Sequence, residues 1–218
     1  MTFTTARTAP NYGDIRRNHL LQGLVASYTA VWIILAISPL DRSDWLLENI
    51  LATALVLGLI FTYPKFPLSD LSYLLITIFL TLHAFGAHHT YSEVPLGFWL
   101  KDTLGLSRNH FDRIVHFAFG LLLAYPIREI LIRRAGVRGP WSYFLTITVV
   151  QACSDLFEII ESWVAQIVTP DLGNAYLGTQ GDEWDAQKDM TLAFTGAVIA
   201  VLVTSTVTRS CSAKLEAA

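Results

Sequence analysis

The sequence predicts an all-α fold, a polytopic membrane bundle of about six transmembrane helices. Of its 218 residues, 53% are hydrophobic and only 15% are charged. The mean hydropathy is +0.45, which is too apolar for an ordinary soluble domain of this size. The apolar residues fall in six long runs, and proline and glycine lie mainly between these runs. Together, these observations favour helices that cross a bilayer.

The predicted membrane-spanning helices cover residues 20–38, 46–63, 70–87, 113–132, 141–167 and 190–208. A helix needs about 20 mainly apolar residues to cross the hydrocarbon core. The first run is long for the roughly 7–15-residue apolar part of a signal peptide, so we expect it to remain as an anchor. Pro39 follows this first run, and Pro64 and Pro67 separate the second from the third.

The later helices are separated in the same way. Pro95 lies in the long loop between the third and fourth, and Gly139 and Pro140 lie between the fourth and fifth. A polar stretch, residues 180–189, precedes the sixth. The sequence has no internal repeat and no second domain, so we expect residues 1–218 to form a single transmembrane domain.

The basic residues favour one orientation. About ten of the 15 Lys and Arg residues lie before the first predicted helix, in the second-to-third and fourth-to-fifth turns, or after the sixth helix. Because Lys and Arg are enriched in cytoplasmic loops, we expect both termini in the cytoplasm. On that side the acidic residues are only Asp14, Asp70, Glu129 and Glu216, so the outer side is acidic.

Histidines and carboxylates concentrate near the outer boundary. Five of the six histidines lie between positions 83 and 116, and Asp112 and His116 share one helix face because they are four residues apart. At 1.5 Å per residue, Glu158 lies about 25 Å along the fifth predicted helix, near the outer boundary. Glu161 follows one turn later, and Asp185 and Asp189 fall on one face if the sixth helix begins early. Four separate segments therefore meet in one layer.

This layer suggests a divalent-metal site. Carboxylates in or near hydrocarbon are costly unless they are paired, hydrated or bound to a cation, and imidazole with carboxylate suits zinc or manganese. The candidate metal ligands are His83, His88, Asp112, His116, Glu158 and Asp189. The candidate catalytic carboxylates, which can act on a metal-bound water, are Glu161 and Asp185.

Such a site predicts a metal-dependent hydrolase or transferase that faces the outer leaflet. Its expected partner is a membrane lipid, or a lipid-linked molecule of the cell envelope. A nucleic-acid partner is not expected, because the formal net charge is −3 and no basic stripe with interleaved aromatic residues occurs.

Other functions fit the same residues. In a proton- or cation-coupled transporter, Asp155, Glu158 and Glu161 would line an ion path, but polarity should then continue to the inner side. The second and sixth predicted helices have almost no polar residues in their middles, which favours a one-sided site. A buried ion-pair network that only stabilises the bundle is a further alternative. A non-catalytic protein that binds a partner is another.

Several motifs resemble a known family. The segments FPLSDLSYLL, LHAFGAHHTYSEVPLGFWLKD, RNHFDRIVHFAFGLLLAYP, EIIES and YLGTQGDEWDAQKDM resemble the YjdF-like bacterial inner-membrane proteins, a family with a domain of unknown function. The likeness extends from the first to the sixth predicted helix. It implies a multi-pass protein of the bacterial inner membrane and implies no particular reaction.

A weaker resemblance is to the VanZ-like membrane proteins, which are linked with glycopeptide-antibiotic tolerance. It rests on Asp112 with His116, on the acidic part of the fifth predicted helix, and on Asp185 with Asp189 before a helix that contains Gly196. The arginine and asparagine of the VanZ pattern have no clear match. A role in the cell envelope would be the implication.

Overall fold

The computed structural model describes residue 15 and residues 18–216, with side chains through Val207. In this part of the chain all regular structure is helical, which confirms the predicted all-α class. The long helices are α1 (His19–Ala36), α2 (Arg42–Thr62), α3 (Asp70–His88), α5 (Phe111–Arg133), α6 (Pro140–Ile167) and α8 (Asp185–Glu216). Two short helices, α4 (Pro95–Leu104) and α7 (Pro170–Leu177), and a 3₁₀ turn at Tyr91–Glu93 complete the described fold.

Six helices of the described residues are long and apolar enough to cross a membrane, as predicted. Two of them begin earlier than hydropathy indicates. α2 begins at Arg42, because the Asp41 side chain accepts hydrogen bonds from the backbone N–H groups of Ser43 and Asp44. α8 begins at Asp185, because an ion pair with Arg108 stabilises its polar first turn. An average of hydropathy along the sequence does not include such contacts.

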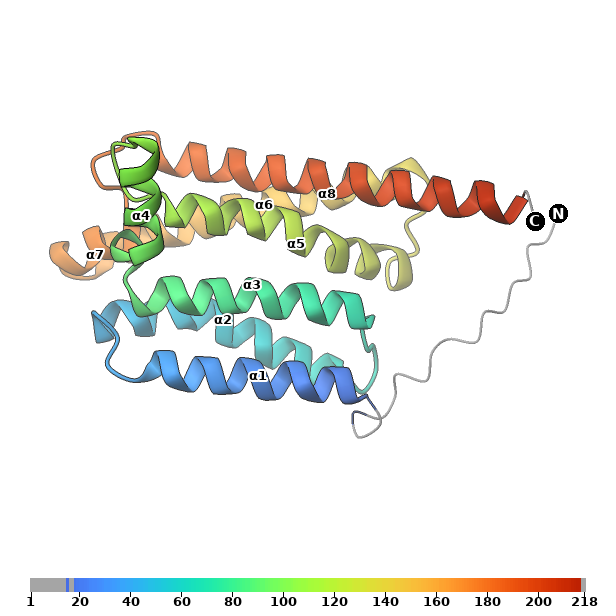
Figure 1. The fold of residues 1–218 in the computed structure, drawn as a ribbon, viewed down its shortest axis with the longest axis horizontal. Coiled ribbons are helices and arrows are strands. Elements are labelled where there is room, and N and C mark those ends of the chain that lie inside the picture. Colours follow the sequence, from blue (N-terminus) through green and yellow to red (C-terminus); the bar gives the residue numbers. More distant parts are fainter. Residues whose placement is uncertain (1–14, 16–17, 217–218) are drawn as a thin grey trace.

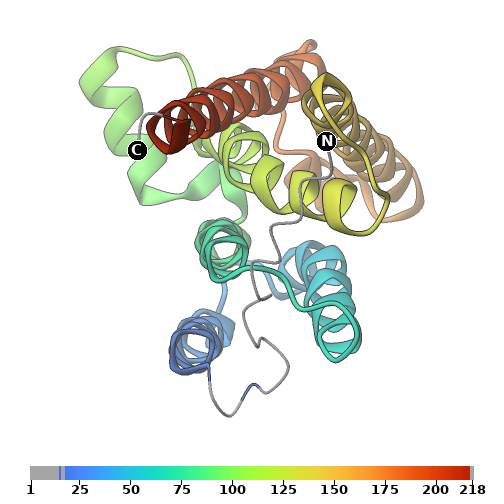
Figure 2. The same ribbon diagram turned by 90° about the vertical axis from the view of Figure 1, so that its right-hand side faces the viewer.

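The long helices form two groups, as Figure 1 shows from the side and Figure 2 along the bundle. The first group contains α1, α2 and α3, and the second contains α5, α6 and α8. The contact between α3 and α5 joins them. An apolar cluster fills this junction, and it includes Leu21, Ala52, Ile76, Leu80 and Leu123.

Helices α5 and α8 approach each other most closely. A Cβ atom on Gly120 would overlap the carbonyl oxygen of Ala193, and one on Gly196 would overlap the carbonyl oxygen of Phe117. Small residues allow transmembrane helices to pack at short range, and this packing replaces the hydrophobic effect that is absent between helices in lipid. The close contact fixes the position of the first turn of α8 against that of α5.

The short helices α4 and α7 both lie at one end of the bundle, on the left of Figure 1, and Figure 2 shows them on opposite sides of it. The side chain of Asn109 holds α4 in place, because it donates to the backbone carbonyl of Val94 (2.9 Å) and lies directly against Gly97. α4 exposes Leu96, Trp99 and Leu104. At this end of the bundle lie the helix ends that the sequence analysis expects on the outer side, where it predicts the site.

Candidate functional site

The first turns of α5 and α8 bring three carboxylates together. Asp112 lies on α5, and Asp185 and Asp189 lie one turn apart on α8. One oxygen from each of the three lies within 4.8 Å of the others. Oxygens that bind one zinc, magnesium or manganese ion lie roughly 3.0–4.2 Å apart, so this group would have to contract by up to about 2 Å to reach ligand distance. Asp185 and Asp189 are almost fully buried.

His116 extends this group toward α6. Its Nε2 atom is 3.5 Å from Asp112 Oδ1 and 3.5 Å from Glu158 Oε1. The imidazole is buried and lies edge-on to the ring of Phe157. His116 therefore connects the carboxylates of α5 and α6, and the histidine and four carboxylates form what we call the acid cluster: Asp112, His116, Glu158, Asp185 and Asp189.

Two arginines hold one side of the acid cluster. The buried Arg108 donates to Asp185 Oδ1 (2.5 Å) and to the backbone carbonyls of Thr179 (2.6 Å) and Gly178 (3.2 Å). Arg113 donates to Asp182 Oδ2 (2.5 Å) and to Asp185 Oδ1 (3.1 Å). Both arginines use the same oxygen of Asp185, so its Oδ2 has no hydrogen-bond partner among the described residues, and neither does Asp189 Oδ1.

A pair of loops supports this arrangement. Gln180 Nε2 donates to the carbonyl of Asn109 (2.9 Å), and the Asn109 N–H donates to Gln180 Oε1 (3.0 Å). Lys188, in the first turn of α8, donates from Nζ to both oxygens of Asp182 in the preceding loop, at 2.8 and 2.6 Å. This hydrogen bond holds the pKa of Asp182 well below its usual range. The two loops thereby fix the entry turns of α5 and α8 to one another.

A cavity of about 350 Å³ adjoins the acid cluster. Its polar end is formed by Glu48, His83, Tyr91, Asp112, His116, Glu161 and Tyr176. The rest of its wall is largely apolar and comes mainly from α2, α3, α5 and α6. The volume falls within the roughly 300–1,000 Å³ that is usual for ligand cavities. Asp112 and His116 belong to both the acid cluster and the cavity, so the two form one connected site.

His83 forms a separate part of the cavity wall. Burial raises the pKa of the Tyr91 hydroxyl well above 10.0, so this hydroxyl keeps its proton and donates to His83 Nδ1 (2.6 Å). The other ring nitrogen, Nε2, then carries the proton and donates to the backbone carbonyl of Glu48 (3.1 Å). Both nitrogens of His83 are therefore engaged by groups that do not belong to the acid cluster.

The remaining predicted residues lie in different places. Glu161 lines the cavity one turn beyond Glu158. His88 contacts the end of α1, where its Nδ1 donates to the carbonyl of Leu35 (2.7 Å). It does not line the cavity and does not belong to the acid cluster. Asp155 accepts a hydrogen bond from Gln151 within α6 (2.5 Å). Of the predicted metal ligands, the structure thus brings together Asp112, His116, Glu158 and Asp189, with Asp185 beside them.

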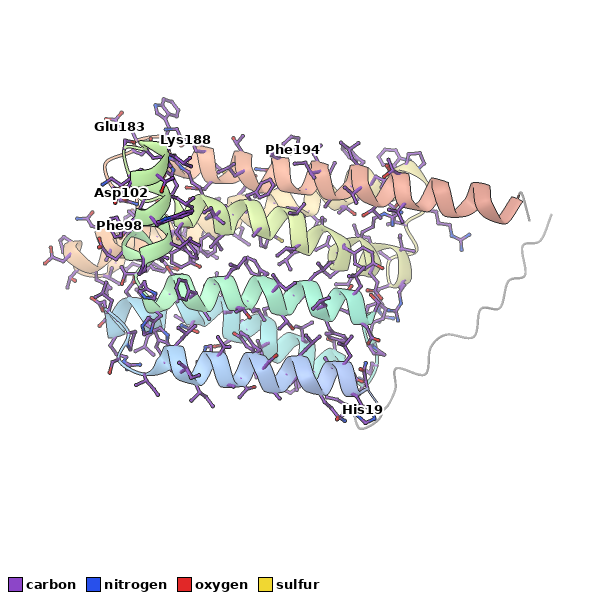
Figure 3. All side chains as sticks on the ribbon, viewed as in Figure 1. His19, Phe98, Asp102, Glu183, Lys188 and Phe194 are labelled. Carbon is purple, nitrogen blue, oxygen red and sulfur yellow. The ribbon has the colours of Figure 1, made fainter. Side chains whose placement is uncertain are left out.

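All side chains are drawn on the ribbon in Figure 3, which places several polar residues at the site end. Asp102, Glu183 and Lys188 are labelled there, and His19, the histidine outside the 83–116 window, lies at the opposite end of the bundle. His110 lies beside Arg113 and accepts a hydrogen bond from it (2.9 Å). Burial and the Arg113 charge lower the pKa of His110.

Sequence reasoning missed several residues of this site. Arg108 and Arg113 enter the prediction only through the alternative of a buried ion-pair network, and the sequence predicts no role for Glu48 and Tyr91. A signal for Glu48 exists in the sequence, because Glu48 and Asn49 lie inside an otherwise apolar run and therefore call for partners. No comparable signal marks Tyr91, whose contact with His83 depends on the 3₁₀ turn.

The acids of the site outnumber its cations. Among the described residues, none of Glu48, Asp112, Glu158 and Glu161 forms an ion pair with a lysine or an arginine. The Glu48 Oε2 and Glu158 Oε1 atoms are buried and accept no hydrogen bond from any residue that the structure describes. Carboxylates in this condition must bind a cation or take up protons.

Comparisons with known proteins agree with the membrane fold. The family described as "Predicted membrane protein (DUF2238)" matches residues 20–210. The inner membrane protein YjdF of Escherichia coli (strain K12) is 38% identical over 184 residues, which cover 84% of this chain and 88% of the relative. No solved structure matches the chain. The protein is thus an integral, multi-pass membrane protein, similar to an inner-membrane relative, and it belongs to the DUF2238 family.

Proposed function

We propose that the protein is a metal-dependent hydrolase or transferase whose site faces the outer leaflet and acts on a membrane lipid or a lipid-linked envelope molecule. The observation that carries this proposal is the acid cluster, in which three carboxylates from α5 and α8 lie within 4.8 Å of one another beside a cavity. A cluster of this kind in a solvated loop would be unremarkable, whereas here two of the three residues are almost fully buried.

The charge balance of the site supports a bound cation. Arg108 and Arg113 donate to only one oxygen of Asp185, so its Oδ2 has no hydrogen-bond partner among the described residues. Asp189 Oδ1 has only the Arg113 Nε atom nearby, at 4.0 Å. A divalent ion such as zinc or manganese would neutralise these oxygens and Asp112. His116 offers an imidazole nitrogen at the edge of the same group.

The carboxylates on the other side of His116 supply the groups that a hydrolase needs. A metal ion lowers the pKa of a bound water, and a nearby carboxylate can accept the proton. Glu161 and Glu158 line the α6 side of the site, and Glu161 faces the cavity. We therefore assign Glu161 as the general base and Asp185 as the carboxylate that the two arginines hold in position.

The surroundings of the site favour a membrane substrate. Most of the cavity wall is apolar, and part of it belongs to exposed residues of membrane-spanning helices, including Leu51 and Leu156. An apolar cluster occupies the junction of α1, α2, α3 and α5, which argues against a polar path along this junction to the opposite side. For this reason we favour an enzyme over a transporter.

Metal-dependent turnover tests the proposal. The purified protein is stripped of metal, reconstituted in vesicles of bacterial envelope lipids, and assayed with added Zn²⁺ or Mn²⁺, with products followed by mass spectrometry. We expect a new lipid product only with metal, and a loss of about 10²–10⁴-fold in rate for Glu161→Gln. The exposed Glu93→Gln serves as the matched control and should retain the wild-type rate.

Folded wild-type protein that forms no product with either metal contradicts the proposal. So does a product that forms equally well in His116→Ala, because that substitution removes the side chain that connects α5 and α6 in the site.

A further inference from the structure

We propose that the cavity holds a membrane lipid with an ammonium headgroup, which enters from the bilayer between α2 and α6 and places the ammonium beside Glu48 and Glu161. This inference rests on the proposed function and names its substrate class. It depends on three features of the cavity: its position toward the bilayer, its apolar wall and the charge of its polar end.

The cavity reaches the bilayer side of the bundle. Leu51 of α2 and Leu156 of α6 both line it, and their side chains are 38% and 53% exposed. Cys153, also on α6, is exposed and lines the same cavity. These residues lie in helices that span the membrane, so lipid rather than water surrounds this face.

The apolar wall suits a hydrocarbon chain. The apolar part of the lining includes Leu55, Phe79, Phe119, Leu123 and Phe157. Such a wall gives no hydrogen bonds to a soluble polar substrate. A lipid would place its chain along this wall and its headgroup at the end where the titratable residues gather.

The polar end of the cavity selects the headgroup. Outside the acid cluster its lining contains two carboxylates, Glu48 and Glu161, and no lysine or arginine. His83 adds no positive charge, because Tyr91 donates to one of its nitrogens and the other nitrogen donates to a carbonyl. An anionic headgroup would meet like charge there, whereas an ammonium would supply the missing counter-charge.

Two polar atoms of the lining also lack partners. Glu48 Oε2 and Ser154 Oγ are buried, accept or donate no hydrogen bond among the described residues, and belong to residues that are 5% and 2% exposed. Both residues line the cavity, from α2 and α6 respectively. Unsatisfied buried polar groups are costly, and the N–H groups of an ammonium would satisfy the carboxylate.

Lipid binding to the metal-stripped protein tests this inference. Native mass spectrometry in detergent, with EDTA present, compares phosphatidylethanolamine with phosphatidylglycerol of the same acyl chains. We expect about tenfold tighter binding of phosphatidylethanolamine, the size of effect that one partly buried ion pair produces. In Glu48→Gln this preference should disappear, and in the control Glu93→Gln it should persist.

Equal binding of the two lipids, or a preference that survives Glu48→Gln, overturns the inference. Because metal is absent, this result leaves the metal-dependent function untouched, and the two failures are distinguishable. If Glu48→Gln does not fold, Cys153 provides a second readout in a Cys211→Ser background. Phosphatidylethanolamine should slow labelling of Cys153 by a membrane-soluble maleimide, and equal protection by phosphatidylglycerol would count against the inference.

Discussion

Arg108 shows how one side chain can fix the geometry of the acid cluster. It is 6% exposed and donates to Asp185 and to two backbone carbonyls that lie about 70 residues away in sequence. A guanidinium can do this because its donors are fixed in a planar fork. The ammonium of a lysine cannot reach the same three acceptors in the same geometry.

Replacing Arg108 with alanine should therefore destabilise the protein. Removal of one partner from a buried ion pair costs about 3–5 kcal/mol, because the other charge remains buried. Thermal unfolding in detergent, followed by loss of monodispersity, measures the change. Arg134→Ala, at an exposed position just after α5, is the control, and an Arg108→Ala variant as stable as this control would contradict the interpretation.

Substitution of Tyr91 tests whether its hydrogen bond to His83 stabilises the protein. Tyr91→Phe removes the donor to His83 Nδ1 and leaves a buried ring nitrogen unpaired, which costs about 1–3 kcal/mol. The control is Tyr125→Phe, since Tyr125 is half-buried and makes no hydrogen bond through its hydroxyl among the described residues. Equal melting temperatures for the two variants would show that the Tyr91–His83 bond contributes nothing.

At the residue scale the sequence predicts which side chains need a partner better than it predicts the partner itself. Asp112, His116, Glu158 and Asp189 are predicted to need partners because unpaired polar groups near hydrocarbon are costly. His83 and His88 satisfy the same rule in another way, through backbone carbonyls that the sequence does not identify. Residue type and depth therefore predict that a partner exists, whereas only the fold decides which one.

At the element scale, the contact between α5 and α8 controls the site. The acid cluster forms where these helices begin, and Gly120 and Gly196 set their separation farther along. Hydropathy predicts both helices as membrane spans. It does not predict the early start of α8 or the short helices α4 and α7, because polar and half-polar turns are stabilised by tertiary contacts rather than by lipid.

Substitution of Gly120 by valine should separate α5 from α8. The new side chain would collide with the backbone of Ala193, and overpacking of this kind costs roughly 1–3 kcal/mol or more. Gly58→Ala in α2 is the matched control, because a Cβ atom there meets no atom within 4 Å. The control should be neutral or slightly stabilising. A Gly120→Val variant with the control's thermal stability would contradict the close packing.

At the scale of the whole molecule, the site occupies one end of the bundle and the basic residues concentrate at the other. Lys65, Arg133 and Arg134 lie in the turns at the end remote from α4, whereas the acid cluster lies at the α4 end. The positive-inside rule therefore predicts that the site faces away from the cytoplasm. Hydropathy and charge are enough for this prediction because it depends on the average properties of whole helices and loops, and not on individual contacts.

Reporter fusions test this orientation. Alkaline phosphatase inserted after Glu93 should be active, since that loop is expected outside, and a fluorescent protein fused to the C-terminus should fluoresce, since it is expected inside. The reverse pattern would place the site in the cytoplasm and rule out an outer-leaflet substrate.

The most direct test of the central claim is elemental analysis of the detergent-purified protein. Wild type is compared with an Asp112→Asn, Asp189→Asn double variant and with Asp102→Asn, an exposed aspartate at the same end (Figure 3). We predict about one zinc or manganese ion per chain in wild type and in Asp102→Asn, and none in the double variant, with all three proteins monodisperse. Folded wild-type protein that holds no divalent metal, even after incubation with zinc and manganese, would contradict the claim.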